Sequence, residues 1–134
     1  MNEPPLPKVA RALLWTDGLA GASVGVGVLA LHPWLARLYG LSESLVLAMG
    51  VANLLYGAYS SRLAVRMARG QRPSARAVDV LVTANGAWAV VCFALAVAFL
   101  GRATFLGVGV LAFEGVFVGG LALLERKHLR PHLG

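Results

Sequence analysis

Long apolar segments alternate with short polar ones along the whole chain. Residues 80–101 contain no charged side chain over 22 positions, and residues 44–61 contain none over 18. A helix needs about 20 residues to cross a bilayer, where every backbone group has to bond internally. The segments do not alternate as the strands of a β-barrel would. The pattern therefore predicts an all-α, transmembrane four-helix bundle. Its predicted spans are roughly residues 12–31, 44–64, 78–100 and 103–124.

The residues between the first two spans are of the kinds that end and begin helices. His32-Pro33-Trp34 predicts the end of the first helix, because proline lacks a backbone donor. We expect residues 33–41 to lie in the membrane interface, with Trp34 and Tyr39 at headgroup level. Ser42 is placed to cap the second helix.

Composition supports a membrane environment. The chain is 58% hydrophobic and 13% charged, whereas soluble domains carry about 25% charged residues. The net charge of +6 comes from basic residues clustered between the apolar segments, so we expect no nucleic-acid partner. A lone cysteine excludes an intrachain disulfide.

The basic residues also predict the orientation. With four spans, Arg37 and Arg102 fall on one side of the membrane and the remaining lysines and arginines on the other. The positive-inside rule makes that second side cytoplasmic, with both termini there, and anionic lipid headgroups are its expected partners. The residues on it are Lys8, Arg11, Arg62, Arg66, Arg69, Arg72, Arg76, Arg126, Lys127 and Arg130.

Polar residues inside the spans mark the candidate site. A charge at the position of Glu114 costs about 2.5–3.5 kcal/mol on the insertion scale, so this residue is expected to be protonated or paired inside the bundle. The candidate polar core or ligand-binding site comprises Glu114, Asn53, Asn85, Tyr56, Trp88 and Asp17. Two interpretations remain open: hydrogen bonds that hold the helices together, or a ligand pocket or proton path.

Glycines are spaced for close helix packing. Gly21 and Gly25 form one small-xxx-small pair, and Gly115 and Gly119 form another. Such pairs let helix backbones approach each other, either within the chain or in a homo-oligomer or larger membrane complex.

The two halves of the chain match weakly. Asp17 and Asp79 are expected to open the first and third helices, and Asn53 and Glu114 fall at similar depths in the second and fourth. This match is compatible with two tandem two-helix repeats but does not establish a duplication.

Familiar catalytic and cofactor motifs do not occur. The sequence has no nucleotide-binding loop, nucleophile triad or metal-ligand spacing. His32, His128 and His132 are predicted to lie on different sides of the membrane. We therefore expect no cofactor, no metal and no assignable catalytic residue.

Two stretches carry a family resemblance. Asn85-Gly-Ala-Trp88 and the segment 33–41 resemble stretches of small four-span bacterial membrane proteins of unknown function. The resemblance implies a bacterial cytoplasmic (inner) membrane location and no particular activity. Small multidrug-resistance exporters also have four spans, but their essential glutamate lies in the first, where this chain has Asp17, so that relationship is not favoured.

Three functions are compatible with these features. The sequence favours a non-enzymatic accessory or scaffold subunit of a membrane assembly. The second is a binding or transport protein for a small apolar or cationic ligand, with Glu114 as its protonatable site. The third is an intramembrane isomerase or lipid-modifying enzyme, which requires Asp17 and Glu114 to form an acid–base pair.

Overall fold

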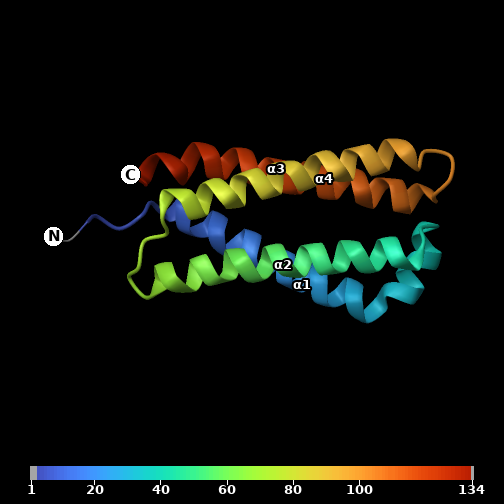
Figure 1. The fold of residues 1–134 in the computed structure, drawn as a ribbon, viewed down its shortest axis with the longest axis horizontal. Coiled ribbons are helices and arrows are strands. Elements are labelled where there is room, and N and C mark those ends of the chain that lie inside the picture. Colours follow the sequence, from blue (N-terminus) through green and yellow to red (C-terminus); the bar gives the residue numbers. More distant parts are fainter. Residues whose placement is uncertain (1–2, 134) are drawn as a thin grey trace.

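The computed structural model describes residues 3–133, which form four long helices and one short 3-10 helix (Figure 1). The elements are α1 (Lys8–Tyr39), α2 (Glu43–Ala68), α3 (Ala75–Ala98), α4 (Phe105–His128) and η1 (Arg130–His132). No strand occurs within these residues. Each long helix has the length and apolar composition needed to cross a membrane. The all-α four-helix bundle predicted from the sequence is confirmed.

The helices are arranged as two hairpins. α1 packs mainly against α2, and α3 packs mainly against α4. The hairpins meet chiefly through α1 and α4, whereas α2 and α3 make few contacts. Both ends of the described chain lie at the same end of the bundle as the α2–α3 link, here named the terminal end (Figure 1). The other end, where the α1–α2 and α3–α4 connections lie, is named the hairpin end.

The prediction that α1 ends at Pro33 is wrong, because the helix continues to Tyr39. Proline cannot donate to the Leu29 carbonyl, and the His32 ring occupies that carbonyl instead, with Nδ1 2.8 Å from its oxygen. The helix ends at Gly40, whose φ of 64° is the left-handed conformation typical of a helix C-terminus. Pro33 therefore lies inside α1, where the hydrogen bond from His32 replaces the one that proline cannot donate.

Side-chain caps begin the later helices. Ser42 accepts a hydrogen bond from the Leu45 amide at 3.2 Å, which confirms the predicted cap of α2. Thr104 caps α4 by accepting from the Gly107 amide at 3.1 Å, and its hydroxyl also donates to the Leu38 carbonyl at 2.8 Å. Thr104 thereby ties the start of α4 to the end of α1.

The glycine pairs are used for packing within the chain. A Cβ added at Gly25 would lie 2.6 Å from the backbone nitrogen of Leu54 in α2. One added at Gly115 would lie 3.0 Å from the Phe93 ring in α3. The other glycines of the two pairs, Gly21 and Gly119, face the same neighbouring helices, α2 and α3. These faces hold each hairpin together.

The distribution of polar and apolar residues differs from that of a water-soluble bundle. Apolar clusters fill the two ends of the core, around Leu14 and Leu81 at one and around Val46 and Leu111 at the other. The buried polar residues are Asp17, Asn53, Ser60, Asn85 and Glu125. Large apolar side chains are exposed instead, among them Phe113 at 70%. Helices that are hydrophobic all round are typical of a bundle in an apolar medium.

Candidate functional site

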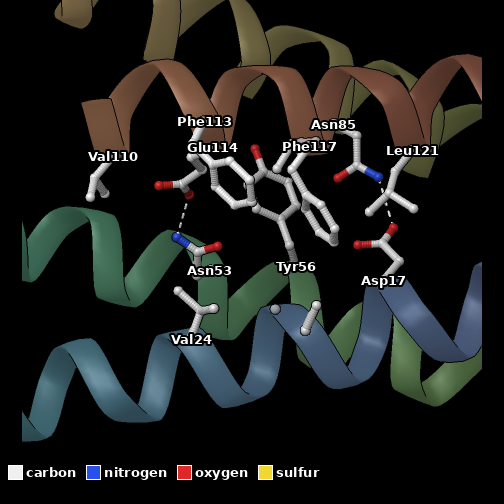
Figure 2. Close-up of a pocket in the computed structure, with 13 residues that line it drawn as sticks. Asp17, Val24, Asn53, Tyr56, Asn85, Val110, Phe113, Glu114, Phe117 and Leu121 are labelled. Carbon is white, nitrogen blue, oxygen red and sulfur yellow. Dashed lines mark hydrogen bonds between the residues drawn. The ribbon is translucent and has the colours of Figure 1, made fainter. Parts of the chain in front are cut away.

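Glu114 is held by donors from two other helices. Asn53 Nδ2 in α2 donates to Glu114 Oε1 at 2.6 Å (Figure 2). Trp88 Nε1 in α3 donates to the same oxygen at 2.8 Å. Asn53 also donates to the Met49 carbonyl at 2.9 Å. These three side chains, the Glu114 cluster, link α2, α3 and α4.

A second polar cluster lies nearer the terminal end. Asn85 Nδ2 donates to Asp17 Oδ2 at 2.8 Å and to Glu125 Oε2 at 3.3 Å (Figure 2 shows the first bond). Their exposed fractions are 1% for Asn85, 5% for Asp17 and 0% for Glu125. This Asp17 cluster links α1, α3 and α4. Asn85 therefore binds Asp17 and Glu125 in place of Glu114, and Asp17 lies well inside α1, not at its start.

Glu125 was not among the residues predicted to form the site. It follows the predicted fourth span and precedes two basic residues, so it resembles part of a charged tail. α4 continues to His128, however, and Glu125 lies seven residues after Val118 and fourteen after Leu111, both buried. A spacing of seven keeps residues on one helix face. That periodicity is the signal that could have found it.

Two buried oxygens near these clusters have no hydrogen-bond partner: Glu125 Oε1 and Ser60 Oγ. Ser60 is fully buried and lies on the same face of α2 as Asn53, two turns closer to the terminal end. Its neighbour Ser61 packs against Gly18, which places Ser60 at the level of Asp17. The unpartnered oxygens thus belong to the level of the Asp17 cluster.

A cavity of about 250 Å³ lies between the hairpins and reaches both clusters (Figure 2). Its polar lining includes Asp17, Asn53, Asn85 and Glu114, and Tyr56 adds an aromatic wall. The other lining residues are apolar or glycine, and none is basic. The cavity therefore offers carboxyl and amide groups in an apolar enclosure, which is a common composition for a small-molecule site.

The cavity wall extends to the outside of the bundle between α1 and α4. Val24, Phe113 and Phe117 line the cavity and are also exposed, by 47%, 70% and 38%. Side chains that belong both to the cavity lining and to the outer surface of the bundle mark the place where these two surfaces meet. The cavity is therefore accessible from the side of the bundle.

The predicted aromatic residues lie beside the polar ones. The Tyr56 ring is tilted against that of Trp88, with centroids 6.1 Å apart. Tyr59 points elsewhere and donates to the Ala77 carbonyl at 2.9 Å. Tyr56 and Trp88 thus form one side of the site near Glu114.

Asp17 and Glu114 occupy different levels of the cavity. Gly25 packs against Leu54, the residue next to Asn53 and hence at the level of Glu114. Asp17 precedes Gly25 by about two turns, or about 12 Å along α1. A general acid and base need to reach the same substrate atoms. This spacing gives no support to an Asp17–Glu114 acid–base pair.

Within residues 3–133, no group of three or more histidine, cysteine, aspartate or glutamate side chains is placed to hold a metal ion. His32 contacts Glu43 at the hairpin end, with Nε2 3.1 Å from Oε1. No family model, curated protein or solved structure matches the chain.

Proposed function

We propose that the protein is a membrane-embedded binding protein for a small lipophilic cation, such as an aromatic or aliphatic amine. The observation that carries this proposal is the cavity between the hairpins, where Glu114 and Asp17 line a largely apolar space together with two asparagines. A transport role would use the same site.

The surface and ends of the bundle support a membrane location. Its exposed valine, leucine and phenylalanine side chains would contact lipid, and the buried polar residues would be shielded from it. Arg62, Arg66, Arg69 and Arg76 are exposed near the terminal end, which by the positive-inside rule lies in the cytoplasm. Anionic headgroups of a bacterial cytoplasmic membrane are their partners in this proposal.

The lining of the cavity favours a positively charged ligand of modest size. It contains two carboxyl groups and no basic side chain, so an anion would meet repulsion and an ammonium group would meet acceptors. A volume of about 250 Å³ corresponds to about eight water-sized groups at about 30 Å³ each. The ligand is therefore of the size of one aromatic ring with a short amine side chain.

The glycine contacts weaken the argument for a scaffold subunit. The small-residue pairs at Gly21–Gly25 and Gly115–Gly119 are both covered by the neighbouring helix of the same hairpin. They therefore offer no free face for self-association of the kind that the sequence allowed. The cavity is therefore a more specific indication of function than the glycine pairs.

Binding can be followed through Trp88, because its indole contacts Glu114. A variant with Trp15→Phe and Trp34→Phe retains Trp88 as its sole tryptophan. We would titrate it in detergent micelles with phenethylamine, 2-phenylethanol and phenylacetate, which have similar sizes but positive, neutral and negative charges. The expected affinity order is amine, then alcohol, then carboxylate. Equal affinities would overturn the proposal. Partition into uncharged micelles alone favours the neutral alcohol over the charged amine, so it cannot produce the expected order.

Replacing Glu114 tests its role in that preference. A hydrogen bond to a charged group contributes about 1.5–3 kcal/mol, so Glu114→Gln should weaken phenethylamine binding about 10- to 100-fold. The binding of 2-phenylethanol should change little. Glu43→Gln makes the same chemical change at an exposed position and serves as the control. Unchanged amine binding in Glu114→Gln would refute the assignment.

A further inference from the structure

The Asp17 cluster contains two acidic side chains and no basic one. The ion pairs of the described residues are His32–Glu43, Arg72–Glu3 and Arg130–Asp79, and none involves this cluster. Buried carboxylates are stable in an apolar medium only when a positive charge or a proton compensates them. The cluster therefore contains no positive charge that compensates its two carboxyl groups.

The two carboxyl groups converge on a single amide nitrogen. Asp17 Oδ2 and Glu125 Oε2 lie 2.8 and 3.3 Å from Asn85 Nδ2, so these two oxygens are within about 6 Å of each other. Two like charges this close inside a protein cannot both ionise without strong repulsion. A single proton on either group removes that repulsion and leaves one negative charge for the amide to bind.

The orientation of the Asn85 side chain favours a bound proton over a bound metal cation at this site. Its amide nitrogen, a donor, faces both carboxyl groups. A sodium ion would require the asparagine oxygen to face the same space, since hard cations are bound by oxygen ligands. Glu125 Oε1, which has no partner and is fully buried, remains as an acceptor for a hydroxyl hydrogen.

We infer that Asp17, Asn85 and Glu125 form a proton-binding site in which the two carboxyl groups share one exchangeable proton. Uptake forms an O–H bond on Asp17 or Glu125 with a proton from water, and release returns it to water and leaves both groups ionised. Ser60 on α2 is a further buried polar group at this level. Glu114 is the remaining carboxyl of the cavity, about 12 Å away along the helix axis.

The cavity gives this proton a connection to the ligand site. Asp17 and Asn85 line the cavity, and Glu125 is bound to Asn85 without lining it. A cationic group that reaches Asp17 would replace the proton as the compensating charge. This coupling rests on the proposed function, but the proton site itself does not.

Infrared spectroscopy of the protein in detergent tests the proton site directly. A protonated carboxyl group has a C=O band that is separate from carboxylate bands and shifts in D₂O. At neutral pH, the difference between wild type and Glu125→Gln should contain such a band. Asp79→Asn, at an exposed acidic residue, should leave that band unchanged. A difference that contains carboxylate bands alone would mean that the substitution removes a carboxylate and no protonated group, and the inference of a shared proton would be wrong.

Further arms separate the alternatives. If Glu114→Gln alone removes the whole acid band, the proton belongs to Glu114 and the inference fails. If the band shrinks when sodium chloride replaces choline chloride, the site prefers a metal cation, which also contradicts the inference. Should Glu125→Gln fail to fold, the Glu114→Gln variant with ¹³C-labelled glutamate and aspartate carboxyls supplies the answer. Its acid band should shift with the labels, and an absent band would overturn the proton site.

Discussion

Gly57 on α2 offers a sharp test of how the first hairpin packs. A Cβ added there would meet the backbone of α1, at 2.6 Å from the carbonyl carbon of Gly21 and 2.7 Å from Cα of Ala22. Ordinary contacts of a Cβ begin at 3.4 Å, and backbone atoms cannot rotate away as a side chain can. The Gly57→Ala substitution therefore has to push α1 and α2 apart by close to 1 Å.

The size of the effect follows from the contacts that this shift weakens. A gap of 0.5–1 Å removes about a quarter to a half of each contact energy of about 0.1–0.2 kcal/mol. Over about 40–60 atom pairs, as many as one buried leucine makes, the loss is about 1–6 kcal/mol. Overpacked cores typically lose about 1–3 kcal/mol after partial relaxation. We expect Gly57→Ala to lower the free energy of unfolding by about 1–3 kcal/mol.

The matched control is Gly86→Ala on α3, where an added Cβ meets nothing within 4 Å. This substitution should change stability by less than about 1 kcal/mol, with the sign set by helix propensity. Both variants would be unfolded by increasing the SDS fraction in mixed micelles, with tryptophan fluorescence and circular dichroism as readouts. Equal stabilities of the two variants would refute the close approach of α1 and α2 at Gly57.

Two further predictions concern polar contacts. Asn85→Leu removes the amide donor of two buried carboxyl groups, Asp17 and Glu125, and should lower the free energy of unfolding by about 1–3 kcal/mol for each. The same micelle unfolding assay would show no loss if those contacts were absent. Thr104→Ala should lower the free energy of unfolding more than Ser74→Ala does, because both residues cap a helix but Thr104 also donates to the backbone of α1. The cap alone contributes about 1 kcal/mol. Equal losses in the two variants would show that the hydrogen bond between Thr104 and α1 adds nothing.

The sequence was sufficient for the architecture because the fold depends on long, uninterrupted apolar segments. A helix is the natural form of such a segment in lipid, so four segments predict four helices whatever their detailed packing. The end of α1 was mispredicted because proline was treated as a stop. The compensation that carries the helix past Pro33 comes from one side chain, His32, whose rotamer is not visible in sequence.

The composition of the polar site could be predicted only from the depth of each residue in the membrane, which follows from its position along a predicted span. Depth predicts Asn53 near Glu114, and Trp88 belongs to the same candidate core. The structure brings all three together. Asn85 lies one turn from Trp88 on the same helix, and that single turn assigns it to the other cluster.

Glu125 shows what counting depth cannot supply. The residues that follow it in sequence are charged, whereas the residues on the same face of α4 are buried. Its position on that buried face determines its environment. The decision depends on how far α4 extends and on η1, which places Leu129 and Leu133 in the apolar core at the terminal end. A glutamate beneath that core is shielded from water, although the sequence would assign it to a solvated tail. The same packing that hides Glu125 also brings it to Asp17, so the site with the most unusual chemistry is the one that required the structure.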